Sequence, residues 1–142
     1  MAVERTLIIV KPDAMEKGAL GKILDRFIQE GFKIVGLKMF RFTPRTAGEF
    51  YKVHRERPFF NELVEFMSSG PVVAAVLEGE DAVRRVREII GPTDSEEARR
   101  VAPNSIRALF GTDKGKNAVH ASDSPESAKE EICFIFSGLE LV

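Results

Sequence analysis

The sequence of 142 residues has a single cysteine, only two histidines and no tryptophan, and its 21 basic residues almost balance 22 acidic ones. Cys133 has no partner for an intrachain disulfide, and the scarcity of cysteine and histidine excludes a zinc finger or a zinc ribbon. The formal net charge of −1 argues against non-specific nucleic-acid binding as the main task, because such binding needs an excess of basic charge.

Long apolar runs are absent as well. The runs Leu7 to Val10 and Val72 to Leu77 are far too short to span a bilayer, and the N-terminus lacks the basic-then-apolar pattern of a signal peptide. We therefore expect a soluble, cytoplasmic protein that makes no membrane contact. The 44% of hydrophobic residues are enough for an ordinary core, so residues 1–142 are predicted to form one domain.

Hydrophobic periodicity predicts the elements of that domain. The expected strands are Thr6 to Val10, Phe32 to Phe42, Val72 to Leu77 and a short piece, Asn117 to Val119. The expected helices lie between Gly18 and Gly31, at Thr46 to Val53, Pro58 to Met67 and Asp81 to Ile90, and from Pro125 to near Cys133. The stretch between the last two helices is expected to be mostly loop, apart from the short strand.

Without the inserted pair of middle helices, the order is strand, helix, strand, strand, helix, strand. This is the split βαβ or ferredoxin-like order, an α+β fold in which helices cover a four-stranded antiparallel sheet. The same fold carries many unrelated functions, so the activity has to be inferred from individual residues.

Two basic side chains occupy positions that suit an anionic ligand. Lys11 follows the first strand, where it is either a solvated strand end or a cation that reaches beyond the sheet edge. Arg87 lies within about 60° of Val83 and Ile90 around its helix, so it flanks the buried face, whereas the two arginines before it point away. It is either packing support or a phosphate ligand, since guanidinium pairs well with phosphate.

A histidine stands between the last expected strand and the last helix. His120 is surrounded by small and polar residues, so a neutral imidazole there is exposed enough to react. Glu131 flanks the inward face of the last helix and is placed to orient that ring. The alternative is a surface histidine at the start of a helix.

A mixed cluster of aromatic and basic residues lies in or between the two middle helices: Tyr51, His54, Arg55, Arg57, Phe59 and Phe60. It suits a phosphate and a stacked base, or else both phenylalanines are core residues and the charges are solvated. Glycine-rich phosphate loops of the P-loop, Rossmann and protein-kinase types are missing, so bound phosphates would be held by side chains. The candidates are Lys11, His54, Arg87, Thr93 and Arg107.

The segment Asn117 to Ser124, NAVHASDS, resembles the active-site signature of nucleoside diphosphate kinases. Further similarities, in the same order and at similar spacing, are Glu4-Arg5-Thr6, Val10-Lys11-Pro12-Asp13, Arg57-Pro58-Phe59-Phe60, Ser69-Gly70-Pro71-Val72-Val73 and Ile106-Arg107. The fold of that family is the ferredoxin-like one expected from periodicity.

The resemblance implies a ping-pong reaction with low base specificity. The γ-phosphate of a nucleoside triphosphate, typically ATP, would form a phosphohistidine on His120 and then move to a nucleoside diphosphate. Glu131 and Ser122 would fix the imidazole, while Lys11 and Tyr51 would neutralise charge on the moving phosphoryl group.

The remaining nucleotide-binding residues that the resemblance implies are His54, Phe59, Leu63, Arg87, Thr93, Arg107 and Asn117. Phe59 would stack on the base, and Asn117 together with Lys11 would bind the ribose hydroxyl. The implied cofactor is Mg²⁺, bridging the phosphates and held mainly by them. The implied partners are nucleotides and further copies of the chain, as a homo-oligomer that is either a hexamer or a tetramer.

The chain departs from the family pattern at several positions. The loop from Thr93 to Arg107 is about three residues longer than is common. Lys114 stands where an apolar residue is frequent beside the base, and Lys116 replaces an arginine. We expect the Cys133 thiol to be buried; the alternative is a cross-link between subunits, which unchanged mobility on non-reducing gels after oxidation would exclude.

Two other functions stay open at this point. A ferredoxin-like sensing module would bind ATP without forming a phosphoenzyme. A nucleic-acid-binding role has some precedent in the family, but the net charge of −1 gives it little support.

Overall fold

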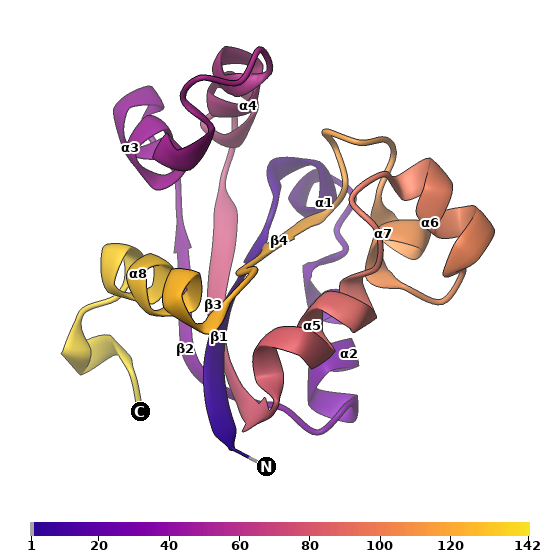
Figure 1. Ribbon diagram of the computed structural model, residues 1–142, viewed down its shortest axis with the longest axis vertical. Coiled ribbons are helices and arrows are strands. Elements are labelled where there is room, and N and C mark those ends of the chain that lie inside the picture. Colours follow the sequence, from indigo (N-terminus) through magenta and orange to yellow (C-terminus); the bar gives the residue numbers. More distant parts are fainter. Residues whose placement is uncertain (1) are drawn as a thin grey trace.

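A four-stranded antiparallel sheet runs through the centre of the computed structural model, which describes residues 2–142 (Figure 1). Its strands are β1 (Val3–Val10), β2 (Lys33–Phe40), β3 (Val72–Glu80) and β4 (Val119–Ala121). They lie in the order β2-β3-β1-β4, and each neighbouring pair is antiparallel. The expected ferredoxin-like fold is therefore confirmed.

Helices cover both faces of this sheet (Figure 1). They are α1 (Pro12–Glu16), α2 (Leu20–Gln29), α3 (Pro44–Phe50), α4 (Phe60–Met67), α5 (Ala82–Ile90), α6 (Ser95–Val101), α7 (Ile106–Phe110) and α8 (Pro125–Ile135), with 3-10 turns η1 (Lys52–His54) and η2 (Gly138–Glu140). The inserted pair α3 and α4 connects β2 to β3. From residue 2 to residue 142, no helix has the length and apolar character to cross a membrane.

The central strand β1 separates two apolar clusters. Ile8 and Val10 point into the cluster that α2 and α5 cover, while Leu7 and Ile9 point into the cluster that α8 covers. All four side chains are fully buried. Alternate residues of a strand face opposite sides, so a sheet covered on both sides needs the continuous apolar run that the sequence shows.

Phe27 is the largest fully buried side chain of α2, and its ring meets Phe32 edge to face at 6.2 Å. We expect Phe27→Ala to lower the free energy of unfolding by about 3–5 kcal/mol, because it removes apolar contacts and leaves a cavity. Urea unfolding at a fixed protein concentration measures the change. Ile28→Ala, on the exposed side of the same helix, is the matched control and should cost less than about 1 kcal/mol. Equal losses for the two variants would contradict this assignment of the core.

The region after Ile90 differs from the expectation of a mostly irregular loop, which was wrong. It contains α6 and α7, and each helix is capped locally: the Asp94 carboxylate accepts the Glu96 N–H at 3.0 Å, and the Ser105 hydroxyl accepts the Ala108 N–H at 3.3 Å. Acidic residues open α6 and arginines close it, which favours the helix dipole. Both helices are too short to display an apolar period.

The starts of the inserted helices were also predicted wrongly. Helix α3 starts at Pro44 rather than Thr46, because Thr43 and Thr46 form a reciprocal capping box around that proline. Helix α4 starts at Phe60 rather than Pro58, and a turn precedes it.

The expectation of a buried Cys133 thiol was wrong as well, since this residue is exposed. Helix α8 turns Ala128 and Ile132 toward the sheet. Cys133 follows Ile132 by one residue, about 100° further around the helix, so its side chain leaves the packed face. A cross-link between subunits stays a hypothesis.

Candidate active site

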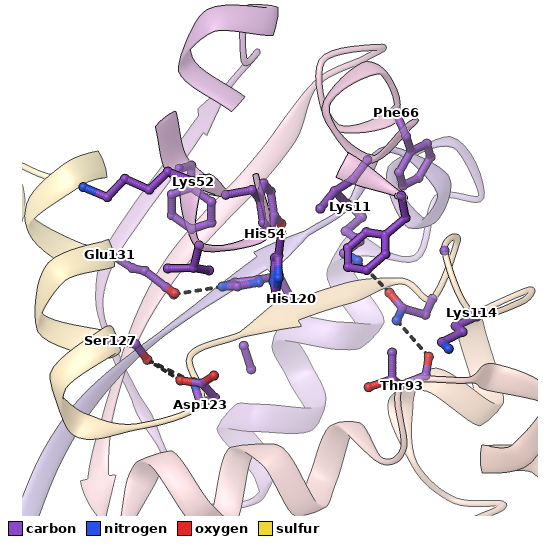
Figure 2. A pocket seen from close by; sticks show the side chains of 18 of the residues that line it. Lys11, Lys52, His54, Phe66, Thr93, Lys114, His120, Asp123, Ser127 and Glu131 are labelled. Carbon is purple, nitrogen blue, oxygen red and sulfur yellow. Dashed lines mark hydrogen bonds and ion pairs between the residues drawn. The ribbon is translucent and has the colours of Figure 1, made fainter. Parts of the chain in front are cut away.

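A cavity of about 940 Å³ opens beside the edge strand β4 (Figure 2). Apart from Ser122, every residue predicted to act at the site lines it: Lys11, Tyr51, His54, Phe59, Leu63, Arg87, Thr93, Arg107, Asn117, His120 and Glu131. Segments far apart in the chain thus meet at one place. Ser122 is fully buried and lies behind Glu131.

His120 lies within β4, not after a strand as expected. The predicted strand Asn117 to Val119 was placed two residues too early, because β4 takes its register from β1, where His120 is opposite Ile9. Residues opposite each other share a face of the sheet, so the imidazole points to the side that α8 covers. The rigid edge of the sheet therefore carries this histidine.

Glu131 of α8 holds the His120 ring from one side. Its Oε1 lies 2.8 Å from His120 Nε2 (Figure 2). The same oxygen accepts a hydrogen bond from the Ser122 hydroxyl, also at 2.8 Å. The side chains of His120 and Glu131 are 17% and 20% exposed. When Nε2 carries the proton and donates a hydrogen bond to the carboxylate, Nδ1 has a free lone pair and can act as a nucleophile.

Aromatic rings enclose the same imidazole. Phe50 and Tyr51 meet it edge to face, with ring centroids 5.2 Å and 5.6 Å away. Burial lowers the pKa of His120 below its ordinary 6.5, and the nearby cations act in the same direction against the opposing effect of Glu131. The ring is therefore neutral at neutral pH, as a nucleophile must be.

The charge of Glu131 can be tested separately from its shape. We expect Glu131→Gln to lower kcat/KM for phosphate transfer by about 10-fold to 100-fold, because a phosphorylated imidazole loses its carboxylate partner. Glu131 raises the pKa of His120, so the acid limb of the pH profile should move to lower pH. Glu126→Gln, in the exposed first turn of the same helix and outside the cavity lining, should stay within about twofold of the parent. An unchanged rate in Glu131→Gln would exclude the orienting role.

Lys11 is buried at the end of β1, which excludes the alternative of a solvated strand end. Its Nζ donates to Asn117 Oδ1 at 2.8 Å, and Asn117 Nδ2 donates to the Thr93 carbonyl at 2.8 Å. Burial, and after it the charge of Arg107, lowers the pKa of Lys11 to about 8. This buried ammonium lines the cavity, where it is available to an anionic ligand.

Two arginines add positive charge next to it. Arg107 donates to the carbonyls of Gly91 and Val119 at 3.1 Å and 2.9 Å, and its buried Nε has no hydrogen-bond partner among residues 2–142. Burial and the charge of Arg87 lower the pKa of Arg107 to about 10. Arg87 donates to the Ala121 carbonyl at 3.1 Å and reaches the cavity from α5, as its position on the helix predicted.

The Tyr51 hydroxyl also reaches this cavity, and it is buried without a hydrogen-bond partner in the part of the chain that the structure describes. Burial raises the pKa of this hydroxyl above its ordinary value, so it remains a proton donor. Such a group is available to a ligand oxygen.

The opposite end of the cavity is apolar. Phe59 is 47% exposed, so it is not a core residue, and its ring centroid lies 5.5 Å from that of His54. The neighbouring Phe60 packs against the core. Leu63 and Phe66 of α4 line this end. Phe66 was missed from the sequence, although its spacing of three from Leu63 puts both side chains on one helix face.

A divalent metal ion at this site would be coordinated mainly by the phosphates of a bound nucleotide. No group of three or more histidine, cysteine, aspartate or glutamate side chains suited to a metal ion occurs within residues 2–142. Lys11, Arg87 and Arg107 all line the cavity, and such cations attract phosphates. These residues fit a metal ion that is coordinated mainly by phosphate oxygens.

A ferredoxin-like sheet whose cavity holds His120 beside Lys11, Arg87 and Arg107 is consistent with a phosphotransferase. Residues 4–141 match the family model for nucleoside diphosphate kinase. The chain is 89% identical, over the full length of both proteins, to a nucleoside diphosphate kinase of Aquifex aeolicus (strain VF5). It is 56% identical to that of Persephonella marina, over all of this chain and 99% of the relative.

Solved structures agree with this similarity. A crystal structure of the Aquifex aeolicus enzyme superposes with a TM-score of 0.98 at 89% identity, covering 99% of this chain and 100% of the other. The Halobacterium salinarum enzyme in complex with CDP superposes with a TM-score of 0.93 at 42% identity, covering 99% and 92%. The chain belongs to the nucleoside diphosphate kinase family and is a phosphotransferase.

Proposed function

We propose that the chain transfers the γ-phosphate of a nucleoside triphosphate to a nucleoside diphosphate through a phosphohistidine on His120. The observation that carries this proposal is the pairing of His120 Nε2 with Glu131 at 2.8 Å in a cavity that also holds Lys11, Arg87 and Arg107. A neutral nucleophile thus shares the cavity with the cations that a transferred phosphoryl group needs.

In the first half-reaction, the Nδ1 lone pair of His120 forms a bond to the γ-phosphorus. The bond from that phosphorus to the β–γ bridging oxygen breaks, and the nucleoside diphosphate leaves with those electrons. Glu131 stabilises the positive charge that develops on the ring. The second half-reaction reverses these events with a different diphosphate, so no net proton is consumed.

Lys11 and Tyr51 are proposed to act on the transferred group. Phosphoryl transfer depends mainly on positioning and on charge stabilisation. A buried ammonium and an unpartnered hydroxyl supply both without rearrangement. Ser122 acts indirectly, since its hydrogen bond holds the Glu131 oxygen that holds His120.

Other residues that line the same cavity are proposed to bind the remaining groups of the nucleotide. We assign the remaining phosphates to His54, Arg87, Thr93 and Arg107, and the ribose hydroxyl to Asn117 with Lys11. Phe59 and Leu63 contact the base, and stacking on a π-face explains low base specificity. The CDP complex of the Halobacterium salinarum relative supports a nucleotide ligand.

The metal ion and the assembly complete the proposal. Mg²⁺ is the expected ion because it binds through substrate phosphates, where it would neutralise charge. We further propose that residues 1–142 act as one domain, in a cytoplasmic homo-oligomer that is either a tetramer or a hexamer.

A pulse-chase experiment tests the phosphoenzyme directly. The protein is mixed with γ-labelled ATP and Mg²⁺, isolated, and assayed for acid-labile label. We expect about one label per chain and its quantitative transfer to added guanosine or thymidine diphosphate. Bound ATP without label would overturn the mechanism and favour a nucleotide-sensing module.

A further inference from the structure

The carboxylate of Asp13 is buried in the first turn of α1, two residues after Lys11. Its Oδ2 accepts the backbone N–H of Ala118 at 3.1 Å, while its Oδ1 has no hydrogen-bond partner among the described residues. The Lys11 N–H donates to the Ala118 carbonyl at 2.8 Å. The start of α1 therefore binds both backbone polar groups of Ala118.

The conformation of Ala118 makes this contact important. Its φ of 76° lies in the left-handed region, which residues with a Cβ adopt at a cost. It separates Asn117, which binds Lys11, from β4, which carries His120. Relaxation of this residue would move the two predicted site residues relative to each other.

Asp13 also acts on Lys11 through its charge. Three charged or titratable groups interact electrostatically with that ammonium: Arg107 from α7, His120 from β4 and Asp13 from α1. Burial and Arg107 lower the pKa of Lys11, whereas Asp13 raises it. Loss of the aspartate charge would therefore favour the uncharged amine.

The hydrogen bond to Ala118 does not by itself require an aspartate. An asparagine has nearly the same shape and can accept the Ala118 N–H in the same way, although its amide would leave buried N–H groups without an acceptor. Burial raises the pKa of Asp13, whereas the charge of Lys11 lowers it and so favours the carboxylate. The hydrogen bond needs only an acceptor, and it is the negative charge that acts on Lys11.

We propose that Asp13 is a positioning residue of the phosphotransfer reaction, holding the left-handed Ala118 between Asn117 and His120 and placing its negative charge near the Lys11 ammonium. This inference rests on the proposed function, in which Lys11 and His120 act on the phosphoryl group. Asp13 touches neither the nucleotide nor the phosphoryl group and acts through its neighbours.

Asp13→Asn separates the charge from the hydrogen bond. We expect the alkaline limb of kcat/KM to lie about one pH unit lower than in the parent, because the Lys11 ammonium loses the nearby negative charge. That shift corresponds to a loss of about fivefold at pH 8 and little loss at pH 6.5. Glu16→Gln, on the exposed side of the same helix, is the matched control and should leave the profile unchanged.

Asp13→Ala removes the hydrogen bond as well. We expect this variant to lose kcat/KM at pH 6.5 too, and Ala118→Gly added to it to recover part of that loss, because glycine adopts the left-handed conformation without strain. The alkaline shift should persist in the double variant. A parental pH profile in Asp13→Asn, or a loss that is equal at every pH and accompanied by a lower melting temperature, would overturn the inference.

Two further variants, His120→Ala and Lys11→Met, are measured in the same assay. They distinguish failure of the proposed function from failure of the role assigned to Asp13. If both lose activity while Asp13→Asn keeps the parental profile, only the role of Asp13 fails. If either retains full activity, the proposed function fails instead.

Discussion

His120→Ala is expected to lose phosphate transfer by about 10⁴-fold or more while it still binds nucleotide. The ping-pong route has no first step without Nδ1, because no phosphoenzyme can form. The cations that we propose to bind phosphates are Lys11, Arg87 and Arg107, and their own hydrogen bonds do not involve the imidazole. The dissociation constant for a nucleoside diphosphate should therefore stay within about threefold of the parental value.

The chain offers a matched control, since His54 is its other histidine. Rapid-quench labelling at saturating ATP should give acid-labile label in His54→Ala and none in His120→Ala. His54 is assigned to phosphate binding, so its variant should show a higher KM. Label that persists in His120→Ala would place the phosphoryl group on another residue.

The second large effect is expected at Lys11, where Lys11→Met should lower kcat/KM by about 10²-fold to 10³-fold. Methionine keeps much of the buried stem but removes the ammonium, which we propose stabilises charge on the transferred group. The hydrogen bond to Asn117 is lost too, so part of the effect should appear in KM. Lys22→Met, on the exposed side of α2, should leave both constants unchanged.

The pH profile of the parent protein follows from the same two groups. Lys11 acts in its protonated form, so kcat/KM should fall as the pH rises through about 8, the pKa that burial gives this group. His120 acts in its neutral form, so the rate should fall on acidification only below its lowered pKa, under the ordinary 6.5. Lys11→Met should lose the alkaline limb and keep the acid limb. An alkaline limb unchanged in that variant would assign it to another group.

Much of the fold could be predicted because its signals are local. Strand β1 is buried on both faces, so its apolar run is uninterrupted. Helices α2 and α5 are each buried on one face, so their apolar residues recur every 3.6 residues. These patterns were enough to predict the order of strands and helices along the chain, and with it the ferredoxin-like fold. Helices α6 and α7 were not predicted, because a helix of five to seven residues depends on its caps and on packing and is too short to show an apolar period.

The candidate site divides in the same way. Residue types, spacing and family resemblance pointed to His120, Lys11 and Glu131, and helix geometry alone put Glu131 on the inward side of α8. Their distances and protonation depend on contacts between residues far apart in the chain. Lys11 and Asn117 are separated by 106 positions, and Asp13 and Ala118 by 105.

Apolar periodicity is a pattern among residues close together in the sequence, so secondary structure and the buried faces could be inferred from the sequence alone. Desolvation and electrostatic pairing exist only once distant segments have packed together. Tertiary packing therefore brings the pKa of Lys11 to about 8 and leaves the Tyr51 hydroxyl without a hydrogen-bond partner among residues 2–142. It also holds Ala118 in a left-handed conformation and exposes Cys133.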